Sequence, residues 1–197
     1  MGRFQRGEAG AFEVLVRRHR GDVFAFLARR VGDRTRAEDL LQETWMKAIG
    51  AAPRWDERAG FRTWIFAIAR NLALDDARRR AFRGTPRPLD GPERPGERSH
   101  AEWLATDDPS PDRLADAARL RPRLEAALAA LPEEQREVFL LREYAGVPFA
   151  EIAAITGAPE PTVKSRMRYA LESLRRRLGE MGITSADVVP QGAGRPP

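Results

Sequence analysis

The sequence contains no cysteine and only two histidines, His19 and His100, among its 197 residues. Without cysteine the chain cannot form a disulfide, and it offers no thiolate for a zinc site, an iron–sulfur cluster or nucleophilic catalysis. Two imidazoles leave little for a metal centre or a histidine-based triad. No apolar run approaches the roughly 18 residues that span a bilayer, and the N-terminus lacks the apolar stretch of a signal peptide. We therefore expect a cytoplasmic protein without metal, cofactor or membrane insertion.

Lysine is also scarce. Lys47 and Lys164 are the only two, so arginine supplies the other 32 of the 34 basic residues, and the net charge is +5. Arginine suits contacts with phosphates and base edges, which favours a nucleic-acid partner, although a compositional bias of the source genome gives the same enrichment.

The charge is distributed unevenly along the chain. Residues 1–83 carry 18 basic and 11 acidic side chains, whereas residues 84–119 carry 5 and 8. The segment after residue 83 alternates proline, glycine and charge, a composition that cannot bury enough apolar surface to fold. We expect four parts: a folded block over 1–83, a flexible acidic linker over 84–111, a folded block over 112–178, and a disordered tail over 179–197.

Both blocks show the three-and-four spacing of amphipathic helices and no strand-like alternation of useful length, which predicts an all-α fold of two small domains. The first block holds three helices. The first begins near Phe12 and is interrupted at 32–33. The second begins at a capping box formed by Thr35 and Glu38. Its apolar stripe is Ala37, Leu41, Trp45, Ala48 and Ile49. The third carries Phe61, Trp64, Ile65, Ile68 and Leu72 on one side.

The second block begins with a helix in which Pro111 takes the first position and Pro122 is expected to kink or split the helix. Its most specific signal lies further on, where Ala153, Gly157 and Val163 have the spacing of a helix-turn-helix. A small residue allows the two helices to approach closely, a glycine tolerates the turn, and the valine packs back onto the first helix.

The second helix of this motif presents a polar and basic side. The residues on it are Thr162, Lys164, Ser165, Arg166 and Arg168. Arginine and lysine reach guanine edges in the major groove, serine and threonine bind phosphates or bases, and Thr162 is also a candidate helix cap. The alternative is an amphipathic helix with a solvated basic side. The helix-turn-helix spacing favours DNA binding.

The third helix of the first block combines aromatic residues with arginines. Trp55 and Trp64 lie near its start, and Arg70, Asn71 and Arg78 follow. Aromatic rings stack on unpaired bases while arginines hold the backbone, although both tryptophans could equally belong to the core. The second helix has an outer face of Asp39, Gln42, Glu43 and Met46, which spacing alone interprets as a solvated face.

Four segments of the chain form a pattern in their order and spacing. They are AEDLLQETW at 37–45, FRTWIFAIARN at 61–71, LPEEQREVFLL at 131–141 and TVKSR at 162–166. In these segments the chain resembles the extracytoplasmic-function (ECF) sigma factors of bacterial RNA polymerase, over about residues 8–83 and 112–178. Pro161, Pro122 and the long proline-rich linker depart from the family pattern.

The resemblance implies a non-enzymatic promoter-specificity subunit. Its partners would be the clamp and flap of core RNA polymerase, promoter DNA in duplex and single-stranded form, and an anti-sigma factor. The resemblance assigns the polymerase surface to Asp39, Gln42, Glu43 and Met46. It assigns −35 recognition to Thr162, Lys164, Ser165, Arg166 and Arg168. It assigns −10 recognition to Trp55, Asp56, Trp64, Arg70, Asn71 and Arg78.

Two other functions are compatible with parts of the sequence. An autonomous helix-turn-helix regulator would bind DNA without polymerase, but the basic, aromatic third helix and the acidic linker disfavour it. A nuclease that binds metal through Asp75 and Asp76 is disfavoured because adjacent residues point about 100° apart around a helix.

Overall fold

The computed structural model describes residues 1–56, 60–82 and 111–183, of which residues 111–119 are described by their backbone alone. Every regular element in these ranges is helical, and no strand occurs in them, which confirms the predicted all-α fold. The expected linker lies outside the described residues apart from Pro111, which begins a helix as predicted. Residues 184–197 of the expected tail also lie outside the described part of the chain.

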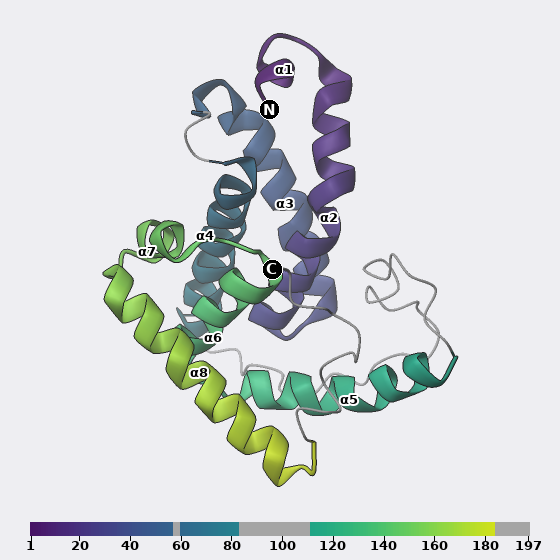
Figure 1. Ribbon diagram of the computed structural model, residues 1–197. Helices are drawn as coiled ribbons and strands as arrows, with labels where there is room; N and C mark the ends of the chain where they lie inside the picture. The colour runs from purple at the N-terminus through teal and green to yellow at the C-terminus, as the bar shows by residue number, and fades with distance from the viewer. Residues whose placement is uncertain (57–59, 83–110, 184–197) are drawn as a thin grey trace, which may run out of the picture.

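The N-terminal domain is a bundle of three long helices with a short N-terminal turn (Figure 1). The elements are α1 (Gly2–Gln5), α2 (Ala9–Val31), α3 (Arg34–Ala51), the 3-10 turn η1 (Ala52–Arg54) and α4 (Phe61–Phe82). Gly32 ends α2 in the left-handed conformation, with φ 69°. Asp33 then caps α3, because its carboxylate accepts a hydrogen bond from the Arg36 amide at 2.9 Å. The predicted capping box at Thr35 is therefore wrong by two residues.

The buried stripe of α3 also differs slightly from the prediction. Its buried residues are Ala37, Leu40, Leu41, Thr44 and Ala48. Leu40 and Thr44 are buried where the sequence indicated Trp45, which is only partly buried, and Ile49, which is 44% exposed. The stripe turns onto α2 and α4, so Ile49, one position beyond Ala48, falls on the flank of the bundle.

The C-terminal domain contains α5 (Pro111–Ala129), α6 (Glu133–Phe139), the π-helical turn η3 (Leu140–Tyr144), α7 (Phe149–Thr156) and α8 (Glu160–Glu180). Helix α5 continues through Pro122, so of the predicted kink or split, the split is wrong. Pro122 is exposed, which lets water satisfy the carbonyl that loses its amide partner. At the other end, α8 extends beyond residue 179 and Ile183 is buried, so the first residues of the expected tail are folded.

The wide turn η3 replaces the end of what the sequence indicates as one continuous helix. The Ala145 amide donates to the Leu140 carbonyl, five residues back, at 3.1 Å. Leu140 and Leu141 are both fully buried. An inserted residue of this kind re-aims the side chains that follow it, and π-turns occur frequently at functional places.

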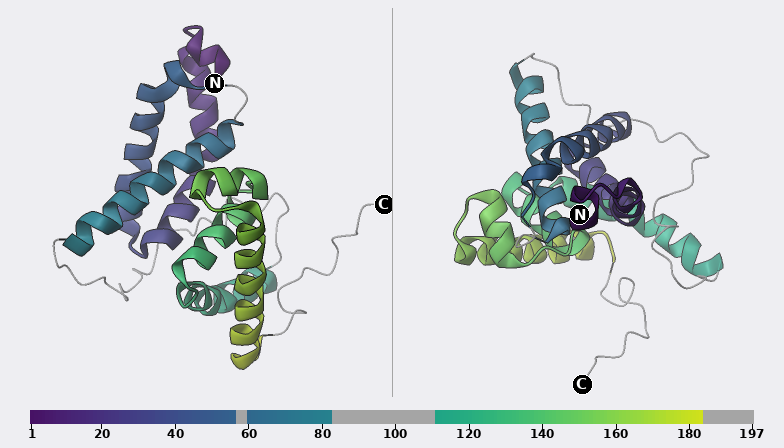
Figure 2. Two further views of the ribbon diagram at one scale, coloured as in Figure 1. Left: turned by 90° about the vertical axis from the view of Figure 1, so that its left-hand side faces the viewer. Right: turned by 90° about the horizontal axis from the view of Figure 1, so that it is seen from above.

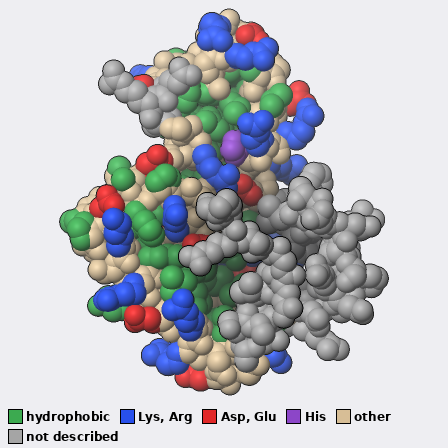
Figure 3. All heavy atoms as spheres, in the orientation of Figure 1, with side chains coloured by type: hydrophobic (Ala, Val, Ile, Leu, Met, Phe, Trp, Pro, Cys, Tyr) green, Lys and Arg blue, Asp and Glu red, His purple; other side chains and the backbone are tan. Residues whose placement is uncertain are grey.

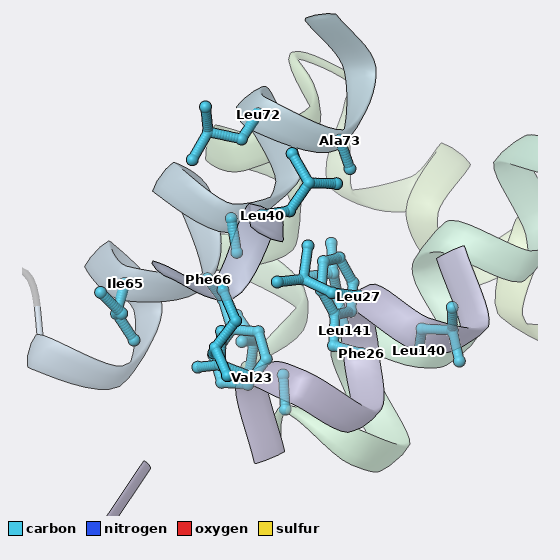
Figure 4. Close-up of a cluster of buried hydrophobic side chains, with 14 of the residues drawn as sticks. Val23, Phe26, Leu27, Leu40, Ile65, Phe66, Leu72, Ala73, Leu140 and Leu141 are labelled. Carbon is cyan, nitrogen blue, oxygen red and sulfur yellow. The ribbon is translucent and has the colours of Figure 1, made fainter. Parts of the chain in front are cut away.

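The two domains share one core. Residues from both, including Phe26, Leu27 and Phe66 from the first domain and Leu140 and Leu141 from the second, form a single buried cluster (Figure 4). A smaller cluster joins α5 to α8 inside the C-terminal domain. The C-terminal domain packs against the α2 and α4 side of the bundle, whereas α3 lies on the side away from α7 and α8 (Figure 2).

Candidate nucleic-acid interface

The helix-turn-helix has the geometry that the sequence predicts. Helix α7 ends at Gly157, whose φ of 72° is left-handed, and α8 begins three residues later. Ile152 and Val163 are both fully buried, one in each helix. The first helix is therefore fixed against the second. Because Val163 and Met167 face the core, the residues on the opposite side of α8 form its outer side.

The outer side of α8 is open. Lys164 and Arg168 have side chains that are 59% and 63% exposed, and Thr162 and Ser165 are also exposed. Their contacts stay inside the helix: Lys164 pairs with Glu160 at 2.7 Å, and the Ser165 hydroxyl donates to the Pro161 carbonyl at 2.9 Å. Such exposed pairs are worth little and yield readily to a phosphate or a base edge. Basic and acidic side chains are interspersed over the described face in Figure 3.

Two details of this motif differ from the sequence reasoning. Thr162 is the third residue of α8 rather than its cap, because the helix begins at Glu160 after Pro159. Pro161 falls in the first turn, where its missing amide costs no hydrogen bond. Arg166 lies at the edge of the outer side, since it pairs with Glu134 at 2.7 Å and its side chain is only 22% exposed.

Tyr169 belongs to the same outer side, and the sequence reasoning missed it. It is 48% exposed, and the Arg168 guanidinium lies 4.8 Å from the centre of its ring. The signal was available, because residue 169 follows Thr162 by seven positions and Ser165 by four, which places all three on one helix face.

The candidate single-strand surface is built around the start of α4. The Gln5 amide donates to the carbonyls of Ala52 and Trp55, at 2.9 and 3.0 Å, and so ties the segment before α4 to α1. Trp55 is partly buried and Asp56 is exposed. Trp64 is also partly buried, and its ring lies 5.8 Å from that of Phe61. Both tryptophans are therefore partly covered and partly accessible.

The remaining residues proposed for this surface separate into two groups. Asn71 and Arg78 are exposed, and Arg78 makes only a 3.5 Å contact with Asp75 in its own helix. Arg70 is different, because its side chain is 14% exposed and its Nε donates to Glu137 of the other domain at 3.0 Å. The structure thus places Arg70 in the contact between the domains.

The outer face of α3 matches the predicted set. Met46 is 70% exposed, Gln42 is exposed, and Asp39 and Glu43 make only contacts within their helix, with Arg36 at 3.3 Å and Lys47 at 3.8 Å. The exposed Ile49 extends this face by one turn from Met46 and adds a second apolar contact point.

The charged groups inside the N-terminal domain have structural partners. Asp76 is buried and binds Arg36 at 2.8 Å, and this hydrogen bond raises the pKa of Arg36. Asp75 points elsewhere, toward Arg78. Burial, followed by the nearby Arg62 charge, lowers the pKa of His19.

No group of three or more acidic, histidine or cysteine residues is placed to hold a metal ion within the described ranges. In the same ranges, no helix has the length and apolar character of a membrane span.

Comparisons with known proteins agree with this architecture. The family model for Sigma-70 region 2 matches residues 15–83, and that for Sigma-70, region 4 matches residues 121–174. The probable RNA polymerase sigma-C factor of Mycobacterium bovis is 34% identical over 169 residues, which cover 86% of this chain and 84% of that protein. The RNA polymerase sigma factor CarQ of Myxococcus xanthus is 33% identical, with 94% and 99% covered.

Solved structures show the same fold. CnrH, in complex with the cytosolic domain of CnrY, superposes with a TM-score of 0.62 at 26% identity, covering 91% of this chain and 94% of that chain. The sigma factor RpoE of Bartonella quintana, in complex with the anti-sigma factor NepR, gives a TM-score of 0.65 at 23% identity, covering 86% and 97%.

Proposed function

The chain belongs to the ECF sigma factors of bacterial RNA polymerase, and from that premise we propose that its two exposed DNA faces and its α3 face divide the work of initiation. Sigma factors bind core polymerase and direct it to promoters. In this division, residues 1–83 bind the polymerase and the −10 element, and residues 112–178 bind the −35 element. The segment between them is a tether.

The −35 assignment is the one that the geometry supports best. The single observation that carries it is the outer side of α8, which projects Lys164 and Arg168 from a packed helix-turn-helix. We assign Lys164, Ser165 and Arg168 to base edges in the major groove, and Thr162 and Arg166 to the sugar–phosphate backbone.

The −10 assignment concerns one strand of opened DNA. Trp55 and Trp64 offer partly anchored rings on which unpaired bases can stack, and Asn71 offers an amide for a base edge. Asp56, Arg70 and Arg78 complete the proposed set. Capturing flipped bases offsets the cost of unpairing, about a few kcal/mol per base by analogy with base-flipping enzymes.

The polymerase assignment rests on the α3 face. Asp39, Gln42, Glu43 and Met46 lie on one side of α3, which the described helices of the C-terminal domain do not cover. Held on the polymerase through this face and through the flap, two weak DNA contacts act together, because tethering raises the effective concentration of each. The nucleotidyl chemistry then belongs to the polymerase, so the chain itself is not an enzyme, and it works in the cytoplasm beside the polymerase.

We also propose an anti-sigma partner. CnrH, a relative of the same fold, is found in complex with the cytosolic domain of CnrY. The exposed apolar side chains of Met46 and Ile49, with the acidic Asp39 beside them, give this chain a surface that a protein of that kind can cover.

Assembly with polymerase tests the function directly. The purified chain should co-elute with core RNA polymerase on gel filtration. It should also redirect transcription on a genomic library to a defined set of start sites. An autonomous helix-turn-helix regulator would instead bind a duplex site alone and leave the start sites of core polymerase unchanged, and that result would overturn the proposal.

A further inference from the structure

One buried carboxylate joins the two domains. Glu137 of α6 accepts hydrogen bonds from Arg70 of α4, at 3.0 Å from Nε and 3.3 Å from Nη2, and from Arg30 of α2 at 3.3 Å. Arg30 also pairs with Glu133 at 2.8 Å. The side chains of Arg30, Arg70 and Glu137 are 5%, 14% and 8% exposed.

Further contacts join the two domains along the same surface, which we call the seam. In them, too, the N-terminal domain supplies the donor groups. Arg29 pairs with Glu125 of α5 at 2.8 Å, and its guanidinium lies 4.2 Å from the ring centre of Tyr144. Thr63 donates to Glu151 of α7. In the contacts with Glu125 and Glu151 the N-terminal domain supplies the donor and the C-terminal domain supplies a carboxylate.

Backbone carbonyls complete the pattern. Arg62 donates to the carbonyl of Tyr144, the last residue of the π-helical turn, and to that of Ala145, the next residue, and it also pairs with Asp22 at 2.9 Å in its own domain. The wide turn therefore has a visible use, because it presents these carbonyls to Arg62 while Leu140 and Leu141 enter the shared core.

Carboxylates arranged in this way occupy arginine forks that would otherwise accept phosphates, because both anions are planar or tetrahedral oxygen acceptors that pair with a guanidinium. Arg70 is the clearest case, since it belongs to the set proposed to hold the opened −10 strand. By contrast, the outer side of α8 keeps Lys164 and Arg168 free of the seam.

We infer that the contact of Glu137 with Arg30 and Arg70 is an autoinhibitory latch. It holds the free chain in a closed form in which one carboxylate takes the place of −10 DNA on Arg70. This inference rests on the proposed function, because Arg70 must serve the opened strand in the open form. Core polymerase releases the latch when it binds the two domains at separate places.

The latch predicts a penalty on DNA binding. When only a fraction of molecules is open, the apparent dissociation constant rises by the inverse of that fraction. Release of the latch should therefore tighten binding of single-stranded −10 DNA to the free chain, without a matching change in binding once polymerase has already opened the molecule.

The test compares Glu137→Gln with Glu13→Gln in the full chain. Both variants exchange a glutamate for its amide, but Glu13 is exposed and pairs only with Arg17 on α2. The probe is the non-template-strand oligonucleotide of a promoter mapped by transcription. Glu137→Gln should bind it about tenfold more tightly than the unmodified chain, and Glu13→Gln should bind it equally to the unmodified chain.

The distance between spin labels on the two domains tests for the closed form in the absence of DNA. Because the chain has no cysteine, Ala77→Cys and Ala154→Cys place two spin labels on exposed positions of α4 and α7. The label separation should be short and narrowly distributed in the free chain. It should lengthen with Glu137→Gln, lengthen less with Glu133→Gln, and lengthen fully on adding core polymerase.

The outcomes separate the two claims. An unchanged label separation and unchanged oligonucleotide binding in Glu137→Gln would overturn the latch, as would opening without tighter binding. Should Glu137→Gln fail to fold by circular dichroism, Glu133→Gln and the response of the unmodified chain to polymerase decide the matter. A chain that opens as described but never redirects transcription would overturn the proposed function and leave the domain contact standing.

Discussion

The outer side of α8 and the inner part of α4 carry the same kind of side chain, yet they differ in what those side chains do. Arg168 pairs loosely with Glu172 of its own helix at 3.9 Å and is open to solvent. Arg70 is enclosed by Glu137 of the other domain. The difference is set by which acidic residues the fold brings near. An arginine on a DNA-binding element is therefore available only where its neighbours are local and exposed.

The core that both domains share gives the largest expected effect. Leu141→Ala removes a fully buried side chain from the cluster that contains Phe26 and Leu27, and such truncations cost about 2–5 kcal/mol of the free energy of unfolding. Urea unfolding followed by circular dichroism measures this cost. Val14→Ala, at an exposed position of α2, is the control and should change stability by less than about 0.5 kcal/mol.

The shared core also predicts that both domains of the Leu141→Ala variant unfold in one transition. If the domains pack as one unit, tryptophan fluorescence, which reports largely on the N-terminal domain, should shift with the circular dichroism signal although Leu141 lies in the C-terminal domain. Two separate transitions, with the fluorescence transition unmoved, would show that the domains unfold independently.

Loss of the open side of α8 comes next in size. Arg168→Ala should cost about 1–3 kcal/mol of the binding free energy for a −35 element. Transcription should therefore fall, but only from promoters with a matched −35 element. Run-off transcription on paired templates with and without that match measures the effect. Arg175→Ala removes the same charge from an exposed position further along α8 and should change little. Equal losses from both templates would place Arg168 on the sugar–phosphate backbone alone.

The sequence predicts the local parts of this comparison well. Helical spacing located the long helices, and the positions of Ala153, Gly157 and Val163 were sufficient to place the helix-turn-helix. These features depend on residues a few positions apart. The errors at Thr35 and Thr162 have a common cause, since each is a threonine near a helix start whose true boundary was set by a neighbouring Asp33 or Pro159.

The contact between the domains was beyond reach from the sequence. Glu137 meets Arg70 across 67 positions and Arg30 across 107. A lone glutamate in an amphipathic helix has no signature that distinguishes a solvated residue from one that closes a distant interface. The contact of Arg62 with the carbonyls of Tyr144 and Ala145 was hidden as well, because the π-helical turn breaks the 3.6-residue period on which the helix prediction relied.

The exposed amide of Asn71 allows a smaller and more selective test of the proposed −10 surface. Asn71→Ala should cost about 1 kcal/mol of binding to the opened strand, the net value of a typical hydrogen bond. Reactivity of −10 thymines toward permanganate should fall severalfold, while binding to core polymerase stays the same. Arg17→Ala, at an exposed position of α2, is the control. Unchanged permanganate reactivity and unchanged choice of −10 sequence would remove Asn71 from the site.

The smallest expected effect lies beside the seam, at His19. Burial and then the Arg62 charge lower the pKa of this imidazole in the folded chain, while Asp22 opposes them and Arg18 adds to them. The unfolded imidazole keeps its ordinary pKa of about 6.5, so between the two values the unfolded chain binds more protons. Stability should therefore be complete above the ordinary pKa and decline as the pH falls through it toward the lowered value.

Urea unfolding at about pH 7.5 and about pH 5.8, above the range in which most carboxylates titrate, isolates this contribution. His19→Gln keeps a polar side chain beside Phe61 but cannot be protonated, so its stability should fall less over the same interval. Arg62 binds Asp22 and the carbonyls of Tyr144 and Ala145, and its charge acts on His19, so protonation of His19 should also weaken this contact between the domains. Identical pH dependence in the two proteins would show that His19 exchanges its proton without cost to the fold.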